Sequence, residues 1–170
     1  PLGAGLINDT YKVSTQETDA PNYVLQRINH AIFQNVELLQ NNIVAVTKHI
    51  RKKLLEAGEQ DIDRKVLNFL ETEEGKTYWF DGENYWRIMV FIPNAKTYET
   101  VNPEYSYYAG QAFGHFQAML ADIPETLGET IPDFHNMEFR LQQLREAVAT
   151  NAAGRLEEVK YYLDEIEKRA

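Results

Sequence analysis

The chain has 170 residues and a formal net charge of −9, with 26 acidic against 17 basic side chains. This balance argues against broad nucleic-acid binding, which needs a basic face, and against binding to an anionic membrane surface. Cysteine is absent, which excludes disulfides and thiolate metal sites and suits a reducing compartment such as the cytoplasm. The longest apolar runs are strand-sized, so the sequence predicts no membrane span.

The first part of the chain predicts two strands and a long helix. Residues 6–13 alternate between apolar and polar types, and residues 22–28 alternate again after the turn residues Pro21 and Asn22. In the second strand Tyr23, Leu25 and Arg27 share one face. A helix is expected over residues 35–57, because apolar residues recur at steps of three and four: Val36, Leu39, Ile43, Val46, Ile50 and Leu54. Gly58 is expected to end it.

Three further strands are expected before the sequence pattern changes to a polar connector and helices. Residues 65–70 predict a strand, and residues 76–92 predict a hairpin that turns at Asp81 and Gly82. The polar segment 93–104, with its two prolines, is expected to be a connector, and the rest is expected to be helical apart from a loop over residues 122–136. Gly110 and Gly114 leave room for a close neighbour on the first of these helices. Two i,i+4 ion pairs are expected on the last helix: Asp164 with Lys168, and Glu165 with Arg169.

This order predicts an α+β fold. The antiparallel sheet with one long helix is the element order of a protein-kinase-like small lobe, and it is followed by a hinge and the first helices of an all-α large lobe. We expect the boundaries to be residues 1–93 for the lobe, 94–104 for the hinge or connector, and 105–170 for the start of the helical lobe.

The opening glycines are the first candidate site. A turn built on Gly3 and Gly5 lets backbone N–H groups approach a nucleotide phosphate without an intervening side chain. A plain glycine turn is the competing interpretation. The stretch is neither a P-loop, because no Gly-Lys-Ser/Thr follows, nor a dinucleotide fingerprint, because the next element is a strand.

A cation and a carboxylate complete the expected kinase-like pattern. In kinase small lobes a basic residue on the third strand contacts the α- and β-phosphates and pairs with a carboxylate on the crossing helix. Arg27 has that place in the order of elements, and Glu37 in the first helical turn is the best carboxylate candidate. The alternatives are an exposed strand cation and a helix-start acid favoured by the helix dipole.

Aromatic residues and histidines offer weaker signals. Tyr78, Trp79, Tyr85 and Trp86 are expected on adjacent hairpin strands, where cross-strand packing explains them better than a carbohydrate platform. The four histidines show no spacing with carboxylates that predicts a metal site.

Several stretches together resemble a known family. The segments "GLINDTY", "YVLQRIN", "YWRIMVFI", "AGQAFGHF" and "TIPDFHN" are similar to those of the aminoglycoside-phosphotransferase-like kinases, and within them to the N-acetylhexosamine 1-kinase group. The resemblance implies a bilobal kinase that uses ATP and Mg²⁺ to make a sugar 1-phosphate. It implies that Gly3 and Gly5 form the phosphate loop, that Arg27 stands where many relatives have Lys, and that Met89, Phe91 and Ile92 belong to the adenine-binding hinge.

One departure from this pattern is important. Such kinases carry a His-x-Asp-x-x-x-x-Asn catalytic loop and a later metal-binding Asp, and no such string occurs in residues 1–170. We therefore expect an N-terminal fragment with no catalytic or metal-binding residue of its own, inactive alone and weak in binding Mg·ATP. The exposed apolar helix faces of such a fragment suggest a homodimer.

Two points stay open. A nucleotide- or sugar-binding module without a catalytic half is the alternative function, and the substrate of a kinase would be N-acetylglucosamine, N-acetylgalactosamine, another sugar or a small amino alcohol. Some members of the resembled group are labelled mucin-desulfating sulfatases. That chemistry needs a modified Cys or Ser in a C/S-x-P-x-R setting, which this sequence lacks, so the label does not apply.

Overall fold

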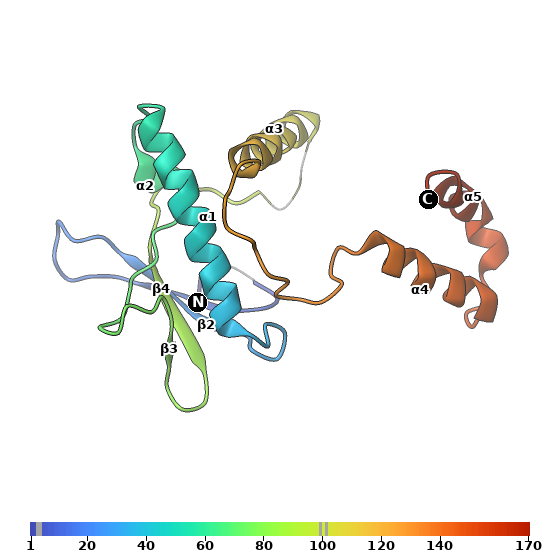
Figure 1. Cartoon of the computed structure of the whole chain (residues 1–170), viewed down its shortest axis with the longest axis horizontal. Helices are drawn as coiled ribbons and strands as arrows, with labels where there is room; N and C mark the ends of the chain where they lie inside the picture. Colours follow the sequence, from blue (N-terminus) through green and yellow to red (C-terminus); the bar gives the residue numbers. More distant parts are fainter. Residues whose placement is uncertain (3–4, 99, 101) are drawn as a thin grey trace. The chain divides into compact units, whose positions relative to one another are not determined.

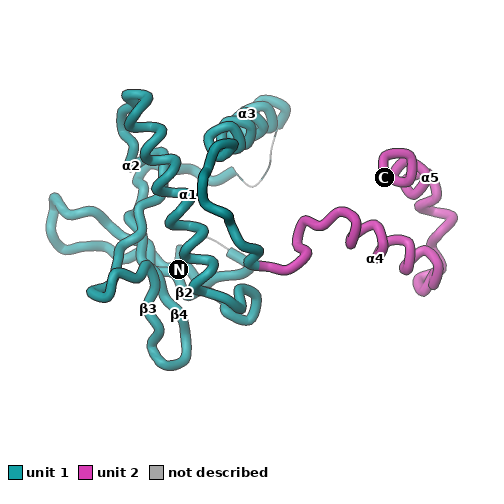
Figure 2. Tube along the Cα trace, in the orientation of Figure 1, with its two compact units in different colours: residues 1–130 teal, residues 131–170 magenta. Residues whose placement is uncertain are grey.

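The computed structural model describes residues 1–2, 5–98, 100 and 102–170. Its elements in chain order are β1 (Asp9–Val13), β2 (Tyr23–Ile28), α1 (Val36–Glu56), α2 (Ile62–Lys65), β3 (Trp79–Phe80), β4 (Tyr85–Val90), α3 (Pro103–Leu120), α4 (Met137–Thr150) and α5 (Leu156–Glu167) (Figure 1). The contacts divide the chain into two compact units, residues 1–130 and 131–170 (Figure 2). The expected boundaries near residues 93 and 104 stay a prediction.

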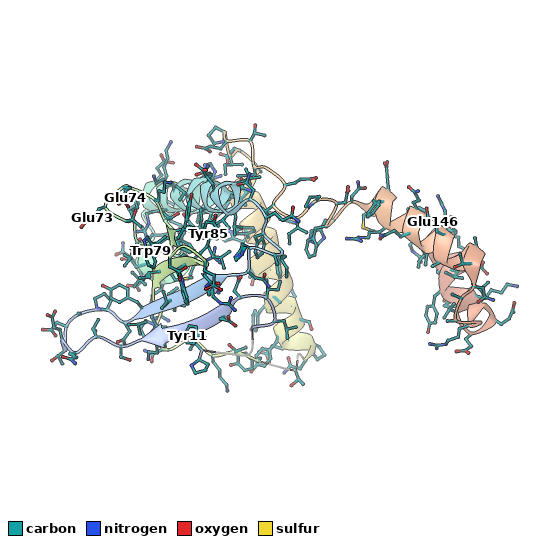
Figure 3. All side chains as sticks on the ribbon, turned by 90° about the horizontal axis from the view of Figure 1, so that it is seen from below. Tyr11, Glu73, Glu74, Trp79, Tyr85 and Glu146 are labelled. Atoms are coloured by element: carbon teal, nitrogen blue, oxygen red, sulfur yellow. The ribbon has the colours of Figure 1, made fainter. Side chains whose placement is uncertain are left out.

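The first unit is built on a four-stranded antiparallel sheet with the order β1-β2-β4-β3. α1 crosses one face of this sheet, as Figures 1 and 3 show together. Ile28 of β2 is fully buried and Met89 of β4 is only 8% exposed, and both side chains point to the α1 side. This arrangement confirms the predicted α+β, small-lobe-like fold with helices after it.

Local sequence explains where α1 begins and ends. The Asn35 side chain accepts a hydrogen bond from Leu38 N at 2.9 Å, which satisfies one of the free N–H groups of the first turn. Gly58 follows the helix with a φ of +69°, as expected for a glycine that ends a helix. Ile50 and Leu54 of α1 pack with Val66 in the core, against which Met119 and Leu120 of α3 are placed. This part of the apolar stripe of α1 therefore packs against α2 and α3.

The segment 65–70 is not the full strand that we predicted. Lys65 is the last residue of α2, and beyond it only residues 68–70 run along β4: Phe69 forms a bridge with Met89, Val90 N donates to Asn68 O at 2.9 Å, and Leu70 N donates to Ile88 O at 3.0 Å. A helical turn thus takes the start of the predicted strand, because Arg64 N bonds back to Asp61 O and Val66 N to Ile62 O.

Two other expectations need correction. Nothing in the described part of the chain lies within 4 Å of a Cβ added at Gly110 or Gly114, so the close neighbour of α3 that we expected is not there. In α5 the Glu165–Arg169 pair forms as predicted, but Lys168 pairs with Glu165 rather than with Asp164. The longer Glu side chain reaches both cations from the preceding turn.

The second unit consists of α4 and α5. The Asn136 side chain caps α4 by accepting a hydrogen bond from Phe139 N at 3.1 Å, and Arg145 of α4 pairs with Glu167 of α5 at 2.7 Å. None of the helices in the described residues combines the length and apolarity that a membrane crossing requires.

Candidate functional site

Leu2 at the start of the chain lies beside β1, an edge strand of the sheet. Leu2 N donates to Thr10 O at 2.7 Å, which brings the start of the chain alongside β1. Asn8, between the turn and β1, accepts a hydrogen bond from Asn29 N at 2.9 Å. Gly3 lies outside the described residues. A Cβ at Gly5 would lie 3.4 Å from Asn8 O, an ordinary contact, so the geometry does not require glycine there and the phosphate role of Gly5 stays a prediction.

Arg27 lies on the sheet face that α1 does not cover. Because side chains alternate along a strand and Ile28 points to α1, the Arg27 side chain points the other way. Its guanidinium is bound by Asp9 on β1, with Nε 2.7 Å from Oδ2, and by Asn84, with Nη1 3.1 Å from Oδ1. Glu37 is exposed in the first turn of α1. The expected ion pair between Arg27 and Glu37 is therefore not formed, because α1 lies across the opposite face. Nucleotide binding by either residue stays a prediction.

A polar network occupies the α1 side of the sheet instead. Arg87 of β4 lies directly opposite Gln26 of β2, and its Nε and Nη2 donate to Gln26 Oε1 at 2.8 and 2.6 Å. Its Nη1 donates to Gln40 Oε1 of α1 at 2.9 Å. The amide nitrogens of both glutamines are also hydrogen-bonded: Gln26 Nε2 donates to Thr10 Oγ1 at 2.9 Å, and Gln40 Nε2 donates to Thr77 O at 2.8 Å. The network thus connects β1, β2, β4 and α1 through side chains.

Arg87 keeps its charge in this network. Burial lowers the pKa of Arg87 to about 10, which still leaves the guanidinium protonated at neutral pH. Within the part of the chain that the structure describes, no carboxylate pairs with it; the remaining contact is the ring of Phe69, whose centroid lies 5.5 Å from Arg87 Cζ. Our sequence reasoning missed Arg87. The available signal was a lone cation inside the apolar run "YWRIMVFI", because a buried strand admits a charge only where polar partners meet it.

The end of β4 leaves two backbone groups unused. Phe91 N donates to Asn22 O at 2.8 Å, whereas in the described residues neither Phe91 C=O nor Ile92 N–H makes a hydrogen bond. Two residues after Phe91, the Pro93 carbonyl oxygen accepts a hydrogen bond from Arg64 Nη1 at 2.7 Å. Lys12 of β1 lies over the Phe91 ring, with Nζ 4.3 Å from its centroid. The predicted hinge therefore offers one acceptor and one donor beside a cation.

A cavity of about 660 Å³ lies beside the β3–β4 hairpin, and Arg87 and Thr77 are part of its lining, together with Leu25, Leu70, Trp79, Trp86 and Ile88 among others. Trp86 Nε1 donates to Asp81 Oδ2 at 2.7 Å. Hydrogen bonds from Asn84 N, from the Trp86 indole and from Glu83 N lower the pKa of Asp81. Tyr85 instead stacks with Phe80, the ring centroids 4.6 Å apart; Figure 3 labels Trp79 and Tyr85 on this hairpin. Of the four aromatic residues expected to pack across the hairpin, Tyr78 and Tyr85 are in contact, with ring centroids 5.9 Å apart.

With this geometry described, the comparison with known families gives one result. The model of the phosphotransferase enzyme family (APH) matches residues 1–170.

Proposed function

Because the chain belongs to the phosphotransferase enzyme family, we propose that it forms the nucleotide-binding part of an ATP-dependent kinase for a small molecule. The observation that carries the proposal is the unused Ile92 N–H at the end of β4. Because the peptide bond between Phe91 and Ile92 is trans, its C=O and N–H point in opposite directions, so one adenine edge can use only one of them. The Ile92 N–H can donate to a ring nitrogen of adenine. We propose that Met89, Phe91 and Ile92 line the adenine site.

The distance along β4 between Phe91 and Arg87 suits a nucleotide that lies on the sheet face covered by α1. Phe91 lies four positions after Arg87, which is about 13 Å of extended chain. An adenine at Ile92 would therefore extend its phosphates toward Arg87, and beyond it toward the turn that contains Gly3 and Gly5. We propose that this turn covers the phosphates with backbone N–H groups.

Mg²⁺ enters this proposal only with the nucleotide. In kinases Mg²⁺ bridges the phosphates and offsets the charge that develops on the transferred group. The described residues contain no cluster of three or more His, Cys, Asp or Glu side chains suited to a metal ion. The proposal therefore assigns the metal no ligand here, and it expects residues 1–170 to bind Mg·ATP weakly and to transfer no phosphate.

Removal of one N–H group tests the adenine site. Ile92→Pro deletes the backbone donor without breaking a hydrogen bond of the fold, whereas Ile92→Val keeps the donor. In a Mg·ATP titration followed by backbone NMR shifts, we expect Ile92→Pro to weaken binding about tenfold, the equivalent of one hydrogen bond of about 1.4 kcal/mol. Ile92→Val should bind like the parent. Equal binding by both variants, or no shift at the end of β4 at millimolar Mg·ATP, would contradict the proposal.

The substrate class rests on the resemblance to N-acetylhexosamine 1-kinases. We propose an N-acetylhexosamine whose anomeric hydroxyl is phosphorylated. ADP release measured with N-acetylglucosamine, N-acetylgalactosamine and a small amino alcohol tests the inactivity of residues 1–170. Titration of the same three compounds into the protein tests the substrate class. Transfer to any of them would overturn the inactivity. Sugar binding with no transfer, in a protein extended by its native downstream sequence, would favour the non-catalytic module.

Partner and location complete the proposal. Several large apolar side chains of the helices are exposed: Tyr107, Tyr108 and Phe113 in α3, Met137 in α4, and Tyr161 and Tyr162 in α5. We propose that a second copy of the chain covers some of these side chains, and that the protein works in the cytoplasm, where ATP is available. Sedimentation equilibrium with a single monomeric species at high concentration would refute the dimer.

A further inference from the structure

We propose that Arg87, and not Arg27, is the cation that binds the phosphates of the nucleotide. This inference rests on the proposed nucleotide site and adds to it the residue that neutralises the phosphate charge. It depends on three observations: the sheet face on which each arginine lies, the missing counter-charge at Arg87, and the neutral amides that hold its guanidinium.

The first observation is the sheet face. In kinases the strand cation that contacts the phosphates also pairs with the crossing helix, so it must lie on the face that the helix covers. Here that face carries Arg87, whose Nη1 donates to Gln40 of α1 at 2.9 Å. Arg27 lies on the other face, where Asp9 already binds its guanidinium. Side chains alternate between the two faces along β2, so the residue beside Arg27 that faces the helix is Gln26, which is neutral.

The second observation is the balance of charge. Arg27 has a carboxylate partner, whereas Arg87 has none within the part of the chain described here. A guanidinium has five N–H donors. That of Arg87 forms three hydrogen bonds, two to Gln26 and one to Gln40, so two donors remain. A partly buried charge with spare donors and no counter-ion has a desolvation cost that is not offset, and a bound anion lowers its free energy. A phosphate oxygen supplies both the charge and the acceptor.

The third observation is the way in which the guanidinium is held. Gln26 Nε2 is bonded to Thr10 and Gln40 Nε2 to Thr77, so both amide oxygens are directed at Arg87. These oxygens fix its orientation without neutralising it. A glutamate at either position would make the ion pair within the protein and leave less charge for a ligand. The pair of glutamines therefore preserves a positive site on a rigid sheet.

The geometry gives a direct test with matched variants of the full 170-residue chain. Arg87→Gln removes the charge. Gln26→Glu keeps Arg87 and neutralises it, and it serves as the second variant should Arg87→Gln fold poorly. Arg27→Gln tests the competing assignment, and Arg145→Gln, in the second unit, controls for the change in net charge. The probes are Mg·ATP and inorganic tripolyphosphate, and the readouts are backbone shifts and the Nε–Hε signal of Arg87.

We expect both probes to shift the Arg87 Nε–Hε signal. Arg87→Gln and Gln26→Glu should each weaken binding at least about tenfold, the equivalent of losing one charge-assisted hydrogen bond of about 1.5 kcal/mol. Arg27→Gln and Arg145→Gln should bind like the parent. Binding that survives both Arg87→Gln and Gln26→Glu but fails in Arg27→Gln would overturn this inference and leave the nucleotide site standing.

The other outcomes are also decisive. Mg·ATP shifts at the end of β4 with an unmoved Arg87 signal would refute the phosphate role of Arg87 alone. Tripolyphosphate that leaves Arg87 unmoved while Mg·ATP moves it would mean that the base or ribose, and not the phosphates, approaches Arg87. No response of any residue to millimolar Mg·ATP would refute the proposed function and this inference together.

Discussion

Asn42 and Gly128 bind each other through two hydrogen bonds although 86 positions separate them along the chain. Asn42 Nδ2 donates to Gly128 O at 2.7 Å, and Gly128 N donates to Asn42 Oδ1 at 3.1 Å. This exchange attaches the loop after α3 to the middle of α1. It also brings the loop backbone against Leu38: a Cβ built on Gly128 would lie 2.6 Å from Leu38 Cδ1. A methyl group at this position would therefore displace the half-buried Leu38 side chain.

Gly128→Ala should therefore destabilise the first unit. The new methyl group forces the Leu38 side chain out of its position or lengthens the two bonds to Asn42, and overpacking of this kind costs about 1–3 kcal/mol in the free energy of unfolding. Urea denaturation measures it. In the Leu38→Ala background the same substitution should cost much less, because the clashing atoms are gone. An equal cost in both backgrounds would contradict the steric explanation.

Two other glycines should respond in opposite directions. Gly82 has a φ of +104° in the β3–β4 turn, where an L-residue is strained, so Gly82→Ala should lower stability by about 1–2 kcal/mol. Gly110 lies inside α3 with nothing within 4 Å of an added Cβ, so Gly110→Ala should raise stability by about 0.5–1 kcal/mol through the lower entropy of the unfolded chain. Thermal unfolding of both variants checks the signs, and a loss of stability in Gly110→Ala would indicate a neighbour on that face.

Asp122 should make the junction of α1 with the end of α3 sensitive to acid. Lys53 Nζ lies 2.6 Å from Asp122 Oδ1, and His49 Nε2 lies 3.3 Å from the same oxygen. The hydrogen bond from Lys53, with a smaller one from His49, lowers the pKa of Asp122. A carboxylate with a lowered folded-state pKa stabilises the fold above its ordinary pKa of about 3.9, and this contribution is lost as the pH falls through the folded value.

The comparison of Asp122→Asn with the parent isolates this effect. At pH 7 the variant should melt at a lower temperature, and the difference should shrink as the pH falls below about 4, where the parent loses the same charge. Glu73→Gln, in the exposed loop before β3, controls for the change in net charge. A difference between Asp122→Asn and the parent that stays constant down to pH 2.5 would rule out the ionised carboxylate as its cause.

Most of the fold followed from periodicity. The stripe from Val36 to Leu54 predicted α1 to within one residue at each end of its observed range, because a long amphipathic helix with an Asn cap and a terminal glycine is strongly specified. The segment 65–70 was harder to predict. It is short, and its first residue is taken by α2, which is held by local backbone bonds that a pattern of apolar residues does not report.

The candidate site was only partly predictable because it depends on register. The sequence placed Arg27 on a strand next to a crossing helix, but which face of the sheet the helix covers is set by the burial of Ile28 and Met89. One step along β2 changes the face. The pairing of Gln26 with Arg87 joins residues from two strands that are not adjacent in sequence, so no local motif reports it.

The last prediction concerns the cost of breaking this network from the helix side. Gln40 is 1% exposed, and its amide serves Arg87 through Oε1 and Thr77 through Nε2. Gln40→Leu fills a similar volume but leaves an arginine donor and a buried carbonyl without partners. We expect a loss of about 2–4 kcal/mol in the free energy of unfolding, measured in urea.

A second substitution shows whether the polar contact or the packing is responsible. Combining Gln40→Leu with Arg87→Met removes both partners, and replacing a buried polar pair with apolar side chains costs less than breaking it. Because Arg87→Met also removes the two hydrogen bonds to Gln26, the double variant is compared with both single variants, and its loss should be smaller than the sum of theirs. Glu37→Gln, exposed one turn earlier on α1, should change stability by no more than about 0.5 kcal/mol. If the losses of the two single variants simply add in the double variant, the contribution of Gln40 comes from packing, because its amide is then not coupled to the guanidinium.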